Sequence, residues 1–214
     1  MKPSTRLATF IRAVTLATPL ALFAFAAPGA DRSPENLFRQ LQDYRTSNHA
    51  ADELLKLARS DPKARKYLAD HLPALLQNES PILFWVWANG AKLAGTLRIT
   101  EASQPLADHV DRFSSPLSSM GWDNRGAVRA LIEIGEPAVP SVAKVLRDGN
   151  VDQRKYSAAV LGVIGTPQCK YILRAALQRE SDLAVLSFIK DALNPPMDWP
   201  KRSWYLSHED KSQP

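Results

Sequence analysis

The chain has 214 residues, of which 45% are hydrophobic and 23% are charged, which is ordinary for a folded water-soluble domain. This composition excludes an intrinsically disordered chain and an integral membrane bundle. The formal net charge of +5 combines 27 basic with 22 acidic residues.

The first 26 residues have the pattern of a secretory signal peptide. Three basic residues and no acidic ones precede an uncharged apolar run, Ala13–Ala27, and Ala24-Phe25-Ala26 predicts cleavage after Ala26. Cleavage after Ala30 is the second choice, because it places Pro28 where a small side chain is preferred. The alternative is a retained membrane anchor, for which the run is slightly short against the roughly 20 residues of a spanning helix. We therefore expect an exported protein, periplasmic or secreted, with membrane attachment only if the segment stays uncleaved.

Export changes the meaning of the positive charge. Removing residues 1–26 leaves 24 basic and 22 acidic residues, mixed along the chain. A nucleic-acid-binding surface needs clustered basic residues, so we expect no nucleic-acid partner. Cys169 is the only cysteine, so an internal disulfide is excluded, and its place in an apolar helix predicts a buried thiol.

Apolar residues recur at helical spacing from residue 31 onward, without a convincing run of strand-like alternation. Asp61-Pro62 and Ser80-Pro81 each supply an N-cap followed by proline, a frequent start of a helix. Trp85 and Trp87 lie two residues apart on one helix and so point to different faces, one toward a neighbouring helix and one toward a surface. Upstream of a loop at 113–121, helices are predicted near residues 37–44, 50–57, 62–75, 81–95 and 100–110.

The second half of the chain contains an internal repeat. The segments LIEIGEP and LGVIGTP place leucine, isoleucine, glycine and proline thirty residues apart. Gly135 and Gly165 are predicted to end one helix in a left-handed conformation, and Pro137 and Pro167 to start the next. Each Gly-x-Pro is therefore a hinge between two antiparallel helices, with helices predicted at about 124–134, 138–146, 151–164, 168–177 and 181–193.

These repeats resemble a known family. Residues 135–140, followed by Asp148, Asp152, Arg154, Ala158, Leu161, Gly162, Ile164 and Gly165, are similar to the short HEAT repeats of phycobilisome-lyase-like proteins. The resemblance is best over residues 121–194, with a weaker echo at Lys92–Leu97. It implies an all-α fold, a right-handed α-solenoid of antiparallel helix pairs over residues 31–194. It also implies that Arg154 binds carboxylate or carbonyl groups of the adjacent repeat.

Partner-binding residues are expected on the second helix of each pair, because these helices line the concave surface of a HEAT solenoid. Arg125, Arg129 and Lys155 are the candidates there. In the tail, residues 195–214, Trp199 and Trp204 are further candidates, since aromatic and basic side chains form interface anchors. For the tail itself, however, the favoured interpretation is that it caps the last repeat and then becomes disordered, with partner binding as the alternative.

The sequence contains no recognisable catalytic, metal or cofactor motif. Its four histidines are scattered, the nearest approach to a ligand cluster is Asp108, His109 and Asp111, and neither GxSxG nor a glycine-rich phosphate loop occurs. We therefore expect an exported non-catalytic scaffold or adaptor that binds a protein partner, without a cofactor. The alternatives are a lyase-type enzyme on a HEAT-like solenoid and an envelope protein anchored by the N-terminal segment; the DNA glycosylases with HEAT-like folds do not fit an exported chain.

Overall fold

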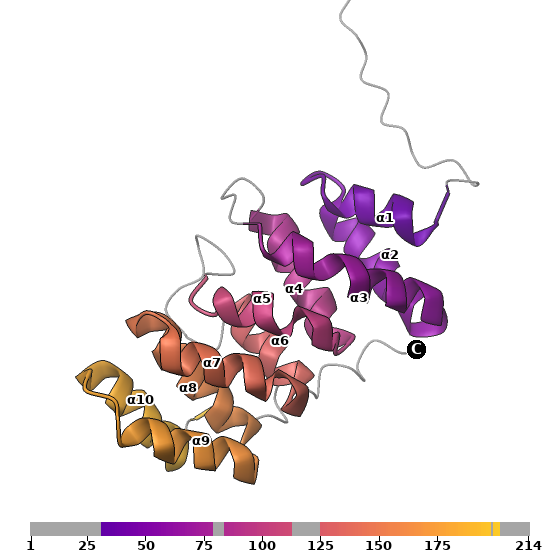
Figure 1. The fold of residues 1–214 in the computed structure, drawn as a ribbon. Coiled ribbons are helices and arrows are strands. Elements are labelled where there is room, and N and C mark those ends of the chain that lie inside the picture. The colour runs from indigo at the N-terminus through magenta and orange to yellow at the C-terminus, as the bar shows by residue number, and fades with distance from the viewer. Residues whose placement is uncertain (1–30, 79–83, 113–124, 198, 202–214) are drawn as a thin grey trace, which may run out of the picture. The chain divides into compact units, whose positions relative to one another are not determined.

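The described part of the chain is helical, which confirms the predicted all-α class (Figure 1). The computed structural model describes residues 31–78, 84–112, 125–197 and 199–201, and within these ranges no strand occurs. The chain divides into residues 1–31 and 32–214, and the described helices all belong to the second unit. The predicted signal peptide and the loop at 113–121 lie outside the described residues.

Two of the first three helices, α1 and α3, begin at a short polar side chain followed by proline. Ser33 accepts a hydrogen bond from the backbone N–H of Asn36 at 3.3 Å, and Asp61 accepts one from Lys63 at 2.8 Å. Each caps the first turn of a helix whose first residue is proline, as predicted for Asp61. The helices are α1 (Pro34–Leu41), α2 (Ser47–Ser60) and α3 (Pro62–Leu76).

The structure differs from the predicted helix boundaries at two places, the end of α1 and the helix expected at residues 100–110. Tyr44, predicted within the first helix, lies beyond its end and is 64% exposed. The helix expected from Thr100 to Val110 starts instead as a 3-10 turn and ends at Asp108. The start predicted at Ser80-Pro81 lies outside the described residues. The elements here are α4 (Phe84–Thr96), η2 (Thr100–Ala102) and α5 (Ser103–Asp108).

The C-terminal helices follow the predicted repeat closely. Asn150 and Gln153 cap α8 reciprocally, each side chain accepting the other's backbone N–H, and Thr166 caps α9 ahead of Pro167. Pro137 differs slightly, because it lies in a 3-10 turn and the α-helix begins two residues later. The elements are α6 (Gly126–Ile134), η4 (Glu136–Ala138), α7 (Val139–Asp148), α8 (Val151–Ile164), α9 (Pro167–Leu177) and α10 (Leu183–Leu193).

Both hinge glycines have positive φ. Gly165 is left-handed, with φ 71° and ψ 10°, as predicted. Gly135 has φ 83° but ψ −135°, a region that side chains exclude more strongly than the left-handed helical one, so the predicted left-handed conformation is corrected there. Both residues accordingly depend on the absence of a Cβ atom.

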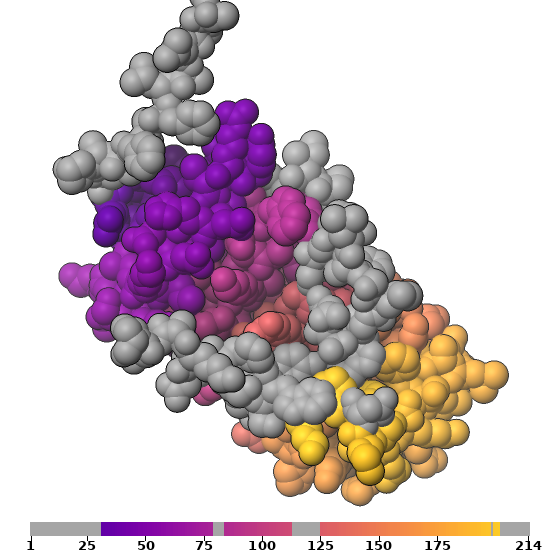
Figure 2. All heavy atoms as spheres, turned by 180° about the vertical axis from the view of Figure 1, so that it is seen from behind, coloured from indigo at the N-terminus to yellow at the C-terminus, as the bar shows by residue number. Residues whose placement is uncertain are grey.

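The helices from α2 onward contact one another in two layers. One layer runs α2, α4, α6, α8, α10, each helix packing against the next, and the other runs α3, α5, α7, α9. Figure 1 shows the second layer in front, and Figure 2, seen from behind, shows the colour changing steadily from indigo to yellow. Neighbouring helices of each layer therefore lie side by side, and the chain alternates between the two layers from one helix to the next.

One hydrophobic core connects these layers. Buried side chains form a continuous cluster from Leu37 to Ala192, with Trp87 the largest of those that are almost fully buried. Each buried leucine contributes about 1.5–3 kcal/mol relative to an exposed one. Cys169 belongs to this core, which confirms the predicted buried thiol.

Small residues bring neighbouring helices of the even-numbered layer close together. A Cβ atom on Gly162 of α8 would lie 2.7 Å from the Cβ of Ala192 on α10, and one on Gly95 of α4 would lie 2.7 Å from the Cα of Ala130 on α6. Gly95 is thus a contact residue inside a helix, like Gly162. The weaker echo at Lys92–Leu97 therefore contains a helix–helix contact where the later repeats have the turns at Gly135 and Gly165.

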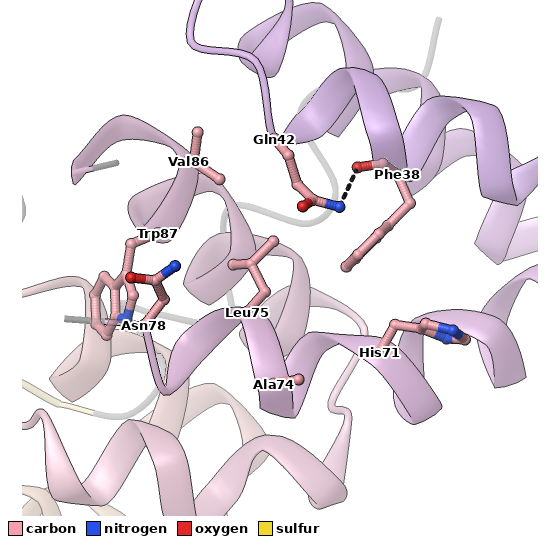
Figure 3. Close-up of a pocket in the computed structure, with 8 residues that line it drawn as sticks. All are labelled: Phe38, Gln42, His71, Ala74, Leu75, Asn78, Val86 and Trp87. Carbon is pink, nitrogen blue, oxygen red and sulfur yellow. Dashed lines mark hydrogen bonds between the residues drawn. The ribbon is translucent and has the colours of Figure 1, made fainter. Parts of the chain in front are cut away.

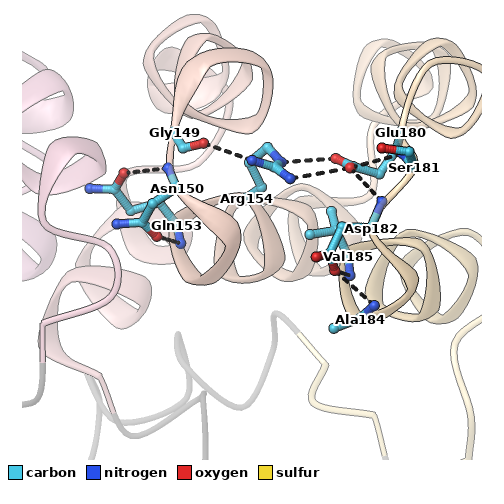
Figure 4. A network of polar contacts seen from close by, with 9 residues as sticks. All are labelled: Gly149, Asn150, Gln153, Arg154, Glu180, Ser181, Asp182, Ala184 and Val185. Carbon is cyan, nitrogen blue, oxygen red and sulfur yellow. Dashed lines mark hydrogen bonds and ion pairs between the residues drawn. The ribbon is translucent and has the colours of Figure 1, made fainter.

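Arg154 connects three parts of the C-terminal helices (Figure 4). Its guanidinium binds both carboxylate oxygens of Glu180, which precedes α10, and donates to the carbonyl of Gly149 between α7 and α8. The same carboxylate accepts the backbone N–H groups of Ser181 and Asp182. This arrangement has the bonds expected of Arg154 from the repeat pattern: a carboxylate and a carbonyl group outside its own helix.

Candidate functional site

Three of the five predicted partner-binding residues lie around the rings of Tyr156 and Phe188: Arg125 just before α6, Lys155 on α8 and Trp199 after α10. The guanidinium of Arg125 lies 4.2 Å from the ring centroid of Tyr156, and the ammonium of Lys155 lies 5.4 Å from the centroids of both Tyr156 and Phe188. The ring of Trp199 stands edge-on to Phe188 at 6.5 Å. We call Lys155, Tyr156, Phe188 and Trp199 the aromatic cluster.

Arg125 supports this cluster from inside. It is 8% exposed, donates a 3.0 Å hydrogen bond to the Tyr156 hydroxyl and donates another to the carbonyl of Asp111. Its cationic plane over the ring adds a favourable electrostatic contact, which is stronger away from water. The side chain of Arg125 therefore fixes the orientation of Tyr156, and little of its surface faces solvent.

Lys155 supplies the positive charge nearest the solvent side of the cluster. Its side chain is 20% exposed and pairs with Asp152 at 2.9 Å. The hydrogen bond to Asp152 raises the pKa of the Lys155 ammonium, with burial and Arg125 acting in the opposite direction. Because the pKa lies above its usual value, Lys155 keeps its charge at neutral pH.

Trp199 reaches the cluster from the segment that follows α10. Its backbone N–H donates to the carbonyl of Pro196 at 3.0 Å, which turns the chain back toward α10. The half-buried indole packs against the hydrophobic core. Trp204, the other tail candidate, lies outside the described residues.

Arg129 is paired with Glu133 and not with a residue of the aromatic cluster. Its side chain, on α6, is 50% exposed and forms a 2.9 Å ion pair with Glu133, whose side chain is 10% exposed. Glu133 in turn lies against Gly95 of α4, where a Cβ atom would approach its carboxylate to 2.5 Å. Arg129 thus offers a guanidinium at the surface of the even-numbered layer, and partner binding by it stays a prediction.

Tyr156 and Phe188 were not singled out from the sequence, although they hold the cluster together. Their ring centroids lie 6.1 Å apart at an interplanar angle of 89°. Tyr156 follows the candidate Lys155 directly, but Phe188 lies in an ordinary apolar helical stripe. Only the packing of α8 against α10 brings it to this position.

A separate apolar pocket of about 250 Å³ opens between α1, α3 and α4 (Figure 3). Phe38, Leu75, Val86 and Trp87 are among the residues that line it. The indole N–H of Trp87 donates to the carbonyl of Leu76 at 2.8 Å, whereas Trp85 is 53% exposed. The two tryptophans therefore divide between core and surface as predicted, and the pocket has room for a small apolar group.

The described residues contain no group of three histidine, cysteine or acidic side chains arranged to hold a metal ion. Of the predicted nearest candidates, Asp108 accepts a hydrogen bond from Gln104 at 2.7 Å and Asp111 accepts one from Asn150 at 3.4 Å. Among the described helices, none combines the length and apolar character needed to cross a membrane.

Neither a family model nor a curated protein matches the chain.

Proposed function

We propose that the chain is a non-catalytic scaffold, an α-solenoid of antiparallel helix pairs that binds a protein partner. The two layers of helices support the solenoid, because each helix packs against the next helix of the same layer, which lies two helices further along the chain. Such an arrangement presents a broad surface made of successive helices. The HEAT-like spacing of Gly135-Glu136-Pro137 and Gly165-Thr166-Pro167 supports the same interpretation.

The aromatic cluster carries the proposal of a protein partner. It combines two partly exposed aromatic rings, Phe188 and Trp199, with the ammonium of Lys155 on adjacent helices. Aromatic and cationic side chains contribute most of the binding energy in many protein interfaces, particularly where they are held rigidly. Arg125 supplies that rigidity from beneath through Tyr156.

We further propose that the protein acts after export. The support is the N-terminal pattern of basic residues, an apolar run and Ala24-Phe25-Ala26. N-terminal sequencing of the protein from its native cells should give Ala27 as the first residue. An intact Met1 in the membrane fraction would instead support the anchored alternative.

Site-specific photo-crosslinking tests the scaffold. A photoreactive amino acid replaces Arg129 on α6 in one variant and Lys144 on α7 in the other, both exposed positions. The first lies in the even-numbered layer beside α8 and the second in the other layer. We expect illumination of native cells to give one defined protein adduct from position 129 and none from position 144.

The aromatic cluster is tested by adding Phe188→Ala to the position-129 variant. Loss of the adduct, with the helical circular dichroism spectrum unchanged, is the expected result. An adduct that persists unchanged assigns the partner to another surface. Absence of any defined adduct from either position contradicts the scaffold.

A further inference from the structure

Arg98 occupies a position at which glycine is the usual residue. It has φ 50° and is, within the described residues, the one non-glycine residue with positive φ. Its backbone N–H donates to the carbonyl of Gly95, and the N–H of Ile99 donates to the carbonyl of Ala94. These two bonds define a Schellman motif that ends α4, with Arg98 in the left-handed C′ position.

The corresponding turns elsewhere in this chain use glycine. Arg98, Gly135 and Gly165 follow α4, α6 and α8, so all three lie where the chain leaves the even-numbered layer. A side chain in this conformation places its Cβ too close to the following carbonyl oxygen, which glycine avoids. The arginine therefore weakens the turn relative to glycine at the same position.

Arg98 lines a polar cleft of about 500 Å³ between α3 and the turn after α4. Arg65 and Lys66 of α3 also line it, and the acidic groups facing the cleft are Asp70 and Glu101. Three cations therefore face two carboxylates. Thr100, at the start of η2, contributes a hydroxyl that donates to Glu101 at 3.2 Å.

The positions of Arg65 and Lys66 are determined by contacts within the chain. Arg65 donates to the carbonyl of Leu97, so it also holds the turn that carries Arg98. Lys66 pairs with Asp70 at 2.8 Å, which compensates one carboxylate locally. The three cations and two carboxylates that line the cleft give it a net positive charge. Arg98 lies at the turn that closes one side of the cleft.

We infer that this cleft binds a segment of the protein partner that carries acidic side chains. Guanidinium groups bind carboxylates through paired, charge-assisted hydrogen bonds, and a cleft positions such pairs better than an open surface does. The inference rests on the proposed scaffold function and adds the chemistry of one contact with the partner. It places that contact in the cleft between α3 and the turn after α4, separate from the aromatic cluster.

The test uses the purified protein and a fluorescein-labelled hexaglutamate peptide, with binding followed by fluorescence anisotropy at low salt. Arg98→Gly should weaken binding about two- to fivefold, the range of an exposed ion pair. The same substitution should raise the melting temperature by about 2–4 °C, because it relieves the strained backbone. Opposite changes in binding and stability would distinguish a ligand contact from a structural role.

Arg174→Ala is the matched control, because it removes one exposed positive charge from α9, outside the cleft. It should leave peptide binding unchanged, and a labelled hexalysine peptide should not bind. Equal affinity of the Arg98→Gly variant and the unaltered protein would overturn the inference, as would equal weakening by Arg174→Ala. If inorganic phosphate displaced the labelled peptide as effectively as unlabelled hexaglutamate does at constant ionic strength, the cleft would be a site for a free anion and not for an acidic segment.

The outcome is separable from that of the scaffold itself. Crosslinking at position 129 reports on α6 and does not require the cleft. If position 129 gives a defined adduct and Arg98→Gly binds the peptide as well as the unaltered protein does, only the inference about the cleft is contradicted. If Arg98→Gly weakens peptide binding but neither crosslinking position gives an adduct, the proposed scaffold function is contradicted.

Discussion

Arg154 and Glu180 form a two-bond ion pair between α8 and the turn before α10. Nε of Arg154 donates to Oε2 at 2.8 Å and Nη2 donates to Oε1 at 3.2 Å, and the two side chains are only 20% and 11% exposed. Because water is largely excluded, either group would be poorly solvated without the other. The pair therefore joins two helical segments more strongly than an exposed ion pair does.

Glu180→Gln should lower the free energy of unfolding by about 1–3 kcal/mol, since it leaves the Arg154 guanidinium without its counter-charge. Urea unfolding measures the change. Asp148→Asn is a matched control, because Asp148 pairs with Arg147 through side chains that are 52% and 57% exposed. The control should change stability by less than about 0.5 kcal/mol, and an equally small effect of Glu180→Gln contradicts the assignment.

The same pair predicts a pH dependence of stability. Burial raises the pKa of Glu180, but the hydrogen bonds from Arg154, Asp182 and Ser181 outweigh it, so the pKa lies below the ordinary 4.5. The unfolded chain therefore binds the proton more readily than the folded one, and stability falls as pH drops below about 4.5. The stability difference between the unaltered protein and Glu180→Gln should shrink over that range in urea titrations. A difference that is constant from pH 6 to pH 3 would contradict the lowered pKa.

Valine at either hinge glycine should destabilise the fold, because a β-branched side chain is strongly disfavoured at positive φ. The effect of Gly135→Val should exceed that of Gly165→Val, since ψ −135° lies further from conformations open to other residues than ψ 10° does. Differential scanning calorimetry should show melting temperatures lowered by more than about 2 °C. Ala175→Val, at an exposed helical position, provides the control, and equal small shifts in all three variants would argue against the hinges.

Local signals in the sequence predicted the helices well. Asp61 caps α3 and Pro167 starts α9, both as predicted, because a cap and a helix-starting proline act within three residues of the helix start. The role of Gly95 was not predictable in this way. Its contact with Ala130 depends on the packing of α4 against α6, whereas a sequence comparison only detects a glycine after leucine and alanine.

The residues of the candidate site were only partly predictable, because some of them are brought together by the packing of distant helices. Arg125, Lys155 and Trp199 were recognisable as residue types that anchor interfaces. Their grouping requires Phe188, which lies more than thirty residues after Lys155 and is placed by the contact between α8 and α10. Likewise, the burial of Arg125 follows from its partner Tyr156 on the next helix of the layer.

Gly162→Ala should destabilise the protein although alanine favours an isolated helix by about 1 kcal/mol. The added Cβ atom would lie 2.7 Å from the Cβ and 2.9 Å from the Cα of Ala192, so α8 and α10 must separate. Overpacking of this kind costs about 1–3 kcal/mol, measurable by urea unfolding. Ser187→Ala, exposed on α10, should be neutral or slightly stabilising. A stabilising effect at both positions would show that the helices can move apart without cost.

The tail should act as a cap on α10, because Trp199 covers Phe188 and packs against the core. Truncation after Asn194 removes this half-buried indole, which we expect to cost about 1–2 kcal/mol, less than full burial of the ring would give. The melting temperature should fall by about 2–8 °C, and aggregation should increase as Phe188 becomes exposed. Truncation after Lys201 is the matched control, because it retains Trp199 and removes only residues 202–214, including Trp204. If both truncated proteins melt like the full chain and stay monomeric by light scattering, the tail is not a cap. If truncation after Lys201 destabilises as much as truncation after Asn194, the stabilising contact lies beyond Trp199.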